Sequence, residues 1–207
     1  MMHHLLSKIF KNIVWIVATN SNEIFLTFDD GPHPEYTPQI LEILNTYQAH
    51  ATFFIVGNKA EQYPHIVRQI DEQGHAIGLH SYSHPRLVGK SRQFILSELG
   101  KTQQVIEEII QKPVMLFRPP YGNFTPLLLR ICVQQQLKVI LWTTASYDYF
   151  LRISNRRILQ KIKNFAEPGT IHVFHDGHKN SFRTASILPE ILEFYHSCSM
   201  KLSALPF

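Results

Sequence analysis

The feature that most constrains the fold is an alternation of short apolar, β-prone runs with longer amphipathic segments along most of the 207 residues. The run from Ile24 to Phe28 is rich in strand-forming residues, and Gly31-Pro32 ends it abruptly. In the segment that follows, apolar residues recur at positions i, i+3, i+4 and i+7 of a single helical stripe: Ile40, Ile43, Leu44 and Tyr47. Such alternation implies a parallel sheet, either doubly wound or closed as a barrel.

The same patterns give approximate boundaries for the elements. We predict strands at Ile24–Phe28, Thr52–Gly57, Ala76–His80, Met115–Arg118, Lys138–Trp142 and Thr170–His175. We predict helices at Pro38–Tyr47, Lys59–Gln73, Arg92–Ile110, Pro126–Gln136, Ile153–Ala166 and Ala185–His196. Two helices begin with Thr-Pro, at Thr37 and Thr125, where the threonine can cap the helix and the proline can occupy the first helical position.

Length and composition indicate one domain over residues 1–207, with 1–22 as a peripheral N-terminal segment. Apolar residues make up 44% of the chain and charged residues 17%, so a continuous core is expected. The net charge is 20 − 16 = +4, and no nucleic-acid module is recognisable. The densest basic stretch is interpreted as the solvated face of a helix. Its members are Arg152, Arg156, Arg157, Lys161 and Lys163.

The two cysteines and the N-terminal segment give less information about the fold and function. Cys132 and Cys198 are too few for a disulfide framework and lie far from the polar motifs, so we do not expect them to bind a metal. Lys8 and Lys11 precede the apolar run 13–18, which loosely imitates a signal peptide but is too short to span a bilayer. We expect this run to be a first strand or packed helix of a cytoplasmic protein without a membrane span.

Two adjacent carboxylates, Asp29 and Asp30, follow the first predicted strand. Because neighbouring carboxylates repel each other, a metal that binds one of them would leave the other free as a base. The alternative is a polar turn in which an aspartate caps the next helix. A second cluster, His80-Ser81-Tyr82-Ser83-His84, offers two imidazoles, and two histidines with one carboxylate leave coordination positions open for water.

Most of these polar residues share a position at the end of a predicted strand. Convergence of several strand ends on one rim is typical of a (β/α) barrel, which we therefore favour over a doubly wound sheet. The residues concerned are Asp29, Asp30, His80, Arg118, Asp148 and His175.

Four motifs together resemble one family. They are Thr27-Phe28-Asp29-Asp30-Gly31-Pro32, His80-x-x-x-His84, Arg118-Pro119-Pro120-Tyr121-Gly122 and Val173-Phe174-His175-Asp176. Their order is that of the polysaccharide deacetylases, the NodB-like carbohydrate esterases of family 4, and the resemblance extends from about Glu23 to the C-terminus. It implies an α/β fold, a distorted (β/α) barrel with about seven parallel strands.

The resemblance also implies roles for individual residues. Asp30, His80 and His84 would hold a divalent metal, with zinc as the expected ion and cobalt, manganese or nickel as ions that related enzymes accept. Asp29 would be the general base, paired with Arg118. The general acid would be His175, oriented by Asp148, which should raise its pKa.

Residues around the acetyl pocket match the family less closely. Tyr121 occupies the position from which the family supplies a backbone amide to the developing oxyanion. Tyr149 stands where a tryptophan is usual, Val173 where a leucine is usual, and Ala145 where an aspartate is usual. None of these replacements removes a predicted metal ligand, base or acid, so acetyl hydrolysis is still expected.

We therefore predict a metal-dependent hydrolase that removes acetyl groups from N-acetylated sugars or polysaccharides by cleaving a C–N amide bond. Two enzymatic alternatives share this site: an O-acetyl esterase of the xylan type and an amidohydrolase of a small nitrogenous molecule. Outside enzymes, the alternative is a carbohydrate-binding protein that has lost catalysis. The predicted partner is an acetylated carbohydrate, and the oligomeric state is left open.

Overall fold

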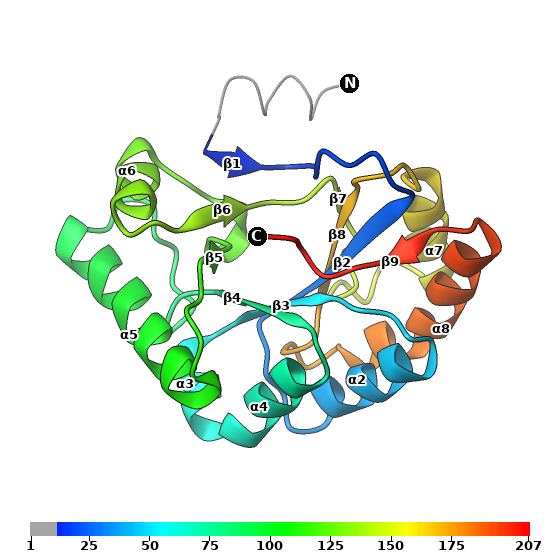
Figure 1. The fold of residues 1–207 in the computed structure, drawn as a ribbon, viewed down its shortest axis with the longest axis horizontal. Helices are drawn as coiled ribbons and strands as arrows, with labels where there is room; N and C mark the ends of the chain where they lie inside the picture. Colours follow the sequence, from blue (N-terminus) through cyan, green and yellow to red (C-terminus); the bar gives the residue numbers. More distant parts are fainter. Residues whose placement is uncertain (1–11) are drawn as a thin grey trace.

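Parallel strands form one curved sheet in the computed structural model, which describes residues 12–207 (Figure 1). The order along the sheet is β1-β6-β5-β4-β3-β2-β8-β7, and β9 pairs with β2. The strands are β1 (Ile13–Val14), β2 (Glu23–Asp29), β3 (Thr52–Ile55), β4 (Ala76–Leu79), β5 (Leu116–Phe117), β6 (Lys138–Ile140), β7 (Thr144–Ala145), β8 (Ile171–His175) and β9 (Lys201–Leu202). Every pairing between these strands is parallel.

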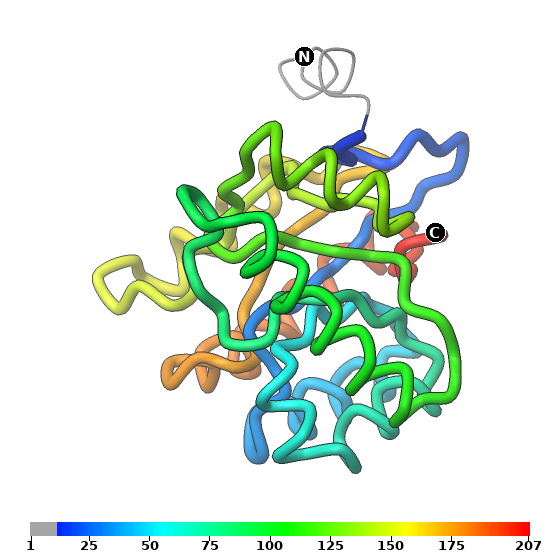
Figure 2. Tube along the Cα trace, turned by 90° about the vertical axis from the view of Figure 1, so that its left-hand side faces the viewer, coloured from blue at the N-terminus to red at the C-terminus, as the bar shows by residue number. Residues whose placement is uncertain are grey.

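Helices surround the outside of the curved sheet (Figure 1). They are α2 (Tyr36–Thr46), α3 (Gly57–Gln62), α4 (Pro64–Glu72), α5 (Arg92–Ile110), α6 (Pro126–Gln134), α7 (Asn155–Asn164) and α8 (Phe182–Ser197), with a 3-10 turn, η1, at Pro120–Gly122. No helix within residues 12–207 is long and apolar enough to cross a membrane. The segment between β7 and α7, yellow in Figure 2, projects from the body of the molecule.

The sheet curls into a distorted barrel whose edge strands, β1 and β7, do not pair with each other. Two contacts nevertheless join the segment after β1 to the β7–β8 side. An isolated antiparallel bridge links Ile16 to Thr170, and the Thr143 hydroxyl donates to the Trp15 carbonyl over 2.8 Å. The predicted parallel (β/α) barrel is therefore confirmed.

Each predicted strand and helix is present, although several boundaries differ. Strand β1 lies in the run 13–18, which was expected to be a first strand or packed helix. Strands β7 and β9 were not predicted, because runs of two residues carry no readable periodicity. The predicted helix Lys59–Gln73 is two helices, α3 and α4. They separate at Tyr63, whose φ of −129° and ψ of 54° are non-helical, because Pro64 disfavours helical geometry in the residue before it.

The two Thr-Pro sequences behave differently. The Thr125 hydroxyl accepts from the Leu128 amide over 3.2 Å, so the predicted cap of α6 is confirmed. The prediction for Thr37 is wrong: α2 begins earlier, at Tyr36, and has no side-chain cap. The Thr37 hydroxyl instead donates to the buried carboxyl of Asp176, 2.5 Å away, so a tertiary contact replaces the local one.

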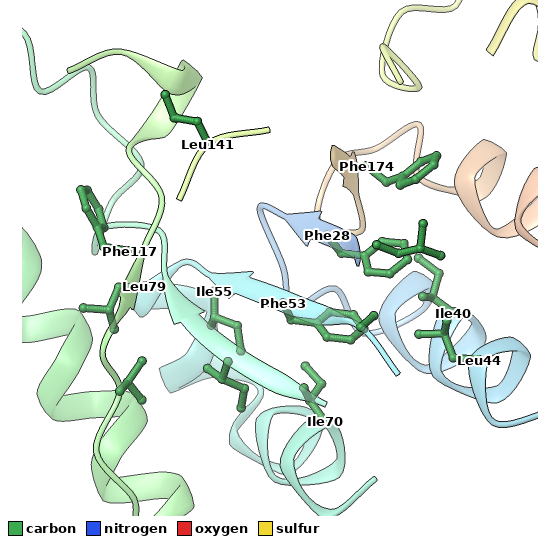
Figure 3. Close-up of a cluster of buried hydrophobic side chains, with 14 of the residues drawn as sticks. Phe28, Ile40, Leu44, Phe53, Ile55, Ile70, Leu79, Phe117, Leu141 and Phe174 are labelled. Atoms are coloured by element: carbon green, nitrogen blue, oxygen red, sulfur yellow. The ribbon is translucent and has the colours of Figure 1, made fainter. Parts of the chain in front are cut away.

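Side-chain alternation along the strands separates the core from the site. On β2, Phe28 faces the helices, where its ring centroid lies 5.0 Å from that of Phe53 and 5.9 Å from that of Phe174 (Figure 3). Because neighbouring residues of a strand point to opposite faces, Thr27 and Asp29 point to the inner face of the barrel. The packing of the apolar face thus fixes the direction of the polar residues at the strand ends.

Candidate active site

The strand ends open into a cavity of about 630 Å³ on one rim of the barrel. Parallel strands bring their carboxyl ends to the same edge, and this edge carries the predicted site. Eight of the ten predicted site residues line the cavity: Asp29, Asp30, His80, His84, Tyr121, Tyr149, Val173 and His175. The other two, Arg118 and Asp148, are fully buried directly behind it.

Asp30, His80 and His84 converge as a potential metal site, with their ligand atoms all within 4.8 Å of one another. The Asp30 Oδ1 atom is 3.0 Å from His84 Nε2 and 3.4 Å from His80 Nε2. Burial would raise the pKa of Asp30, but the neighbouring imidazoles of His80 and His84 hold it well below its ordinary value. The cluster therefore keeps the Asp30 carboxylate ionised beside two imidazole nitrogens that could bind a metal.

The orientation of His80 is set by a backbone group. Its Nδ1 lies 2.8 Å from the Arg118 carbonyl. Because a carbonyl can only accept, Nδ1 carries the proton and Nε2 presents its lone pair toward Asp30. Two imidazole nitrogens and one carboxylate oxygen in this arrangement fit a divalent transition metal with further positions open.

The backbone of Asp30 adopts a left-handed conformation, with φ of 72°. Lys59 compensates by donating from Nζ to the carbonyls of Asp30, at 2.7 Å, and Gly177, at 2.8 Å. Close approach also requires glycine at 177, since a Cβ there would lie 1.8 Å from the Asp30 carbonyl oxygen. The loops after β2 and β8 are thereby locked together around the carboxylate.

The loop that carries His84 is organised by Glu98 of α5. Its carboxylate accepts from the backbone amides of Tyr82 and Ser83, both at 2.9 Å, and from the Ser83 hydroxyl at 3.0 Å. His84 itself has a left-handed φ of 56°. The buried Glu98 therefore acts as the anchor for a loop whose conformation is intrinsically unfavourable.

Asp29 is held separately from the potential metal ligands. Arg118, which is completely buried, donates from Nη1 to Asp29 Oδ1 and to the Thr27 hydroxyl, both at 2.7 Å. Its remaining nitrogens donate to the carbonyls of Ile140 and Leu141, so the guanidinium cannot rotate away. The second oxygen of Asp29, Oδ2, lies 4.0 Å from His80 Nε2 and is thus next to the metal site.

His175 and Asp148 form a second buried pair across the cavity. The Asp148 Oδ1 atom is 2.7 Å from His175 Nδ1, and Oδ2 accepts from the His175 amide at 2.8 Å and from the Thr184 hydroxyl. Burial alone would lower the pKa of His175, but the Asp148 carboxylate raises it to about 9. With Nδ1 occupied, Nε2 is the nitrogen available to hold a proton toward the cavity.

The pocket wall between these pairs is apolar and aromatic. The Tyr149 ring packs edge-on against His175 with centroids 4.8 Å apart, and Val173 and Trp142 also line the cavity. Tyr121 lies on the other side, 4.8 Å from the His84 ring centroid, with a left-handed φ of 62°. Ala145 lines the same space, where it contributes only a methyl group.

Some residues of the site were missed in the sequence. Glu98 had a readable signal, because it interrupts the apolar stripe of α5 between Ile95 and Thr102, and a charge on a buried stripe needs partners. Lys59 had none, since its acceptors belong to loops far away in the chain. Two histidines outside the predicted site have other places: His75 accepts from the Ala51 amide, and His178 lines the cavity.

The chain is similar in sequence to several known proteins. The sequence matches the family model described as polysaccharide deacetylase over residues 17–140. A chitooligosaccharide deacetylase of Azorhizobium caulinodans is 37% identical over 163 residues, covering 78% of this chain and 77% of that protein. Two peptidoglycan-N-acetylglucosamine deacetylases of Bacillus cereus are 33% and 30% identical over 75% and 87% of this chain, and the matches span 56% and 84% of their own lengths.

Solved structures give the same result. The crystal structure of a peptidoglycan N-acetylglucosamine deacetylase superimposes with a TM-score of 0.91 at 28% identity, covering 97% of this chain and 94% of that one. A CE4 family pseudoenzyme from Bacillus anthracis has a TM-score of 0.84 at 27% identity, covering 93% and 67%. With the family motifs present in order on one barrel rim, the chain belongs to the polysaccharide deacetylase family.

Proposed function

We propose that this protein is a metal-dependent deacetylase that removes the N-acetyl group from an amino sugar within a glycan. One observation carries the proposal: the Asp29–Arg118 pair and the His175–Asp148 pair face one cavity beside the Asp30, His80 and His84 cluster. The relatives named as chitooligosaccharide and peptidoglycan deacetylases support the choice of an acetylated amino sugar.

The mechanism assigns separate tasks to the two buried pairs. Asp29, kept ionised and aimed by Arg118, would accept the proton of the attacking water. His175, held by Asp148, would donate a proton from Nε2 to the departing sugar amine. A divalent ion held by Asp30, His80 and His84 would supply a Lewis acid for the acetyl oxygen and acidify water beside Asp29.

The apolar wall would exclude water and receive the acetyl methyl group. Val173 and Tyr149 stand at this wall, and both are smaller or shaped differently from the residues usual in the family. Tyr121 would offer its backbone amide to the developing oxyanion. With these assignments, the residues at the rim of the cavity would determine which glycan binds.

A catalytically inactive binding protein is the alternative from another class, and the solved structure from Bacillus anthracis is described as a pseudoenzyme of this family. Here both buried pairs and the complete potential metal cluster are present. A protein that only binds sugar has no need of a buried Arg118 on Asp29 or of a buried Asp148 on His175, each of which is expensive to desolvate.

The test is acetate release from N-acetylglucosamine oligomers by the full chain, loaded with zinc or cobalt or treated with a chelator. We expect release that the metal restores and the chelator abolishes. Acetylated xylan and a cyclic amide run in parallel separate the esterase and small-molecule amidohydrolase alternatives. Faster turnover of either, with no release from the amino-sugar oligomers, would overturn the proposed substrate class.

A further inference from the structure

Two exposed tyrosines flank the cavity, and a cation covers a face of each. The Arg86 guanidinium lies 4.5 Å from the ring centroid of Tyr121, and Lys161 Nζ lies 4.0 Å from that of Tyr147. Both tyrosines line the cavity, and they are 52% and 39% exposed. Tyr121 follows β5 and Tyr147 follows β7, which are separated in the sheet by β4, β3, β2 and β8. The two tyrosine–cation pairs therefore stand on different sides of the site.

The positive charge at the Tyr147 side is not neutralised locally. Between Asp148 and Glu167 the chain has no acidic residue but five basic ones. Within the described residues, Lys163 pairs with Glu190, whereas Lys161 and Arg86 form no ion pair. Exposed basic residues with no ion pair extend the charge along the loop and α7: Arg152, Arg156 and Arg157.

The loop that carries Tyr147 is held by hydrogen bonds from two buried side chains, Arg183 and Asn180. Arg183, only 6% exposed, donates to the carbonyls of Asp148, Phe150 and Ile153. Asn180 donates to the Tyr149 carbonyl over 2.8 Å. Because buried side chains hold this projecting segment (Figure 2), the Tyr147–Lys161 pair is formed before any ligand binds, which reduces the entropy lost on binding.

We propose that the two tyrosine–cation pairs bind carboxylates of an acidic glycan on either side of the N-acetylated sugar. This inference rests on the proposed function and names its substrate class. Exposed aromatic rings pack against the C–H faces of sugars, while the cations pair with carboxylates that a neutral oligomer lacks. A glycan is the fitting anionic polymer because both pairs border the cavity through which the reacting sugar must pass.

The experiment compares two glycans that differ only in charge. One is an oligosaccharide of alternating N-acetylglucosamine and N-acetylmuramic acid, and the other is the same oligosaccharide with its carboxylates converted to methyl amides. For the metal-loaded wild type, we expect kcat/KM for acetate release to be about tenfold higher on the acidic form, or about threefold per cation, as for exposed ion pairs. Added salt should reduce this ratio.

Variants identify the cations responsible. Arg86→Gln/Lys161→Gln should bring the ratio of acidic to amidated kcat/KM close to one, and Arg86→Gln alone should lower it about threefold. Lys163→Gln is the matched control, because this lysine lies on the same helix but pairs with Glu190. It should keep the wild-type ratio.

Three results would overturn the inference. Equal rates on both glycans would overturn it while leaving the proposed function intact. No acetate release from either glycan would also overturn it, and release from N-acetylglucosamine oligomers in the same assay would show that the proposed function still holds. Loss of sedimentation with phosphatidylglycerol vesicles in the double variant, with the glycan ratio unchanged, would assign the cations to a lipid surface instead.

Discussion

The two sides of the site each bury an aspartate against a cation, but they do so by different means. On the side of the proposed base, here called the base side, Asp29 pairs with Arg118, which is itself fixed by two backbone carbonyls at the end of the neighbouring strand β6. On the acid side, Asp148 pairs with His175 and receives further hydrogen bonds from a loop serine and from Thr184 of α8. Strands build the first pair, whereas a loop and a helix complete the second.

The two sides therefore differ in their cation: the charge of Arg118 is permanent, whereas His175 can lose its proton. Arginine stays protonated throughout the physiological pH range, so the base side keeps one charge state. Histidine exchanges a proton in this range, which is the property that a general acid needs and which makes the acid side sensitive to pH. The contrast predicts different responses to mutation on the two sides.

The largest expected effect is on the base side. Arg118→Leu leaves the buried Asp29 carboxylate without its partner, so we expect the free energy of unfolding to fall by about 3–5 kcal/mol. Urea denaturation monitored by circular dichroism measures it. The double variant Arg118→Leu/Asp29→Asn should recover part of the loss, because the unpaired charge is gone. Equal stability of Arg118→Leu and wild type would refute a buried ion pair here.

On the acid side, Asp148→Asn is expected to act mainly on turnover. The amide cannot raise the pKa of His175 or hold its Nδ1 proton in the same way, so kcat should fall by about 100-fold or more. Steady-state acetate release at saturating substrate gives this value, with the bound metal quantified in parallel. A kcat equal to that of wild type would show that Asp148 does not orient the acid.

The pH dependence of stability also distinguishes the two sides. The folded pKa of His175, about 9, is raised above its ordinary value of 6.5. Its pairing therefore stabilises the fold fully below pH 6.5, and this stabilisation is lost as the pH rises through about 9. We expect the metal-free protein to lose about 1–3 kcal/mol of unfolding free energy over this interval.

Urea denaturation at a series of pH values measures that slope, with Asp148→Asn as the comparison. The variant should lose most of the slope between pH 6.5 and 9. An identical slope in both proteins would mean that another group is responsible.

The smallest expected effect concerns the anchor of the His84 loop. Glu98→Gln removes the charge that accepts from three donors, so zinc affinity should fall by about tenfold, as for other groups that orient metal ligands. Glu108→Gln is the matched control on the exposed side of the same helix, where the carboxylate accepts a hydrogen bond from the Gln104 side chain. Isothermal titration with zinc compares them, and equal affinities would remove Glu98 from the site.

The base side was largely predictable from the sequence, and the acid side only in part. Asp29, Asp30, His80 and His84 belong to short motifs at strand ends, where local patterns define both the strand and its polar continuation. Asp148 and His175 were also predicted. The residues that fix them were not, because Thr184 and Arg183 carry no local signal and lie on α8.

The errors in the fold have the same origin. Thr37 has the local pattern of a helix cap but bonds to Asp176, which is distant in the sequence. The two-residue strands β7 and β9, which were not predicted, exist only through pairing with other parts of the sheet. Short sequence motifs in this chain predicted the polar residues at the strand ends. Contacts between residues far apart in the sequence could not be predicted in this way.

The adjacent aspartates Asp29 and Asp30 are proposed to have different tasks, one as the general base and the other as a metal ligand. Zinc affinity and acetate release from N-acetylglucosamine oligomers should be measured for Asp29→Asn and Asp30→Asn side by side. We predict that Asp29→Asn binds zinc but releases no acetate, whereas Asp30→Asn loses most of its zinc affinity. Acetate release by Asp29→Asn at the wild-type rate, or zinc binding unchanged in Asp30→Asn, would contradict the assignment of base and metal ligand.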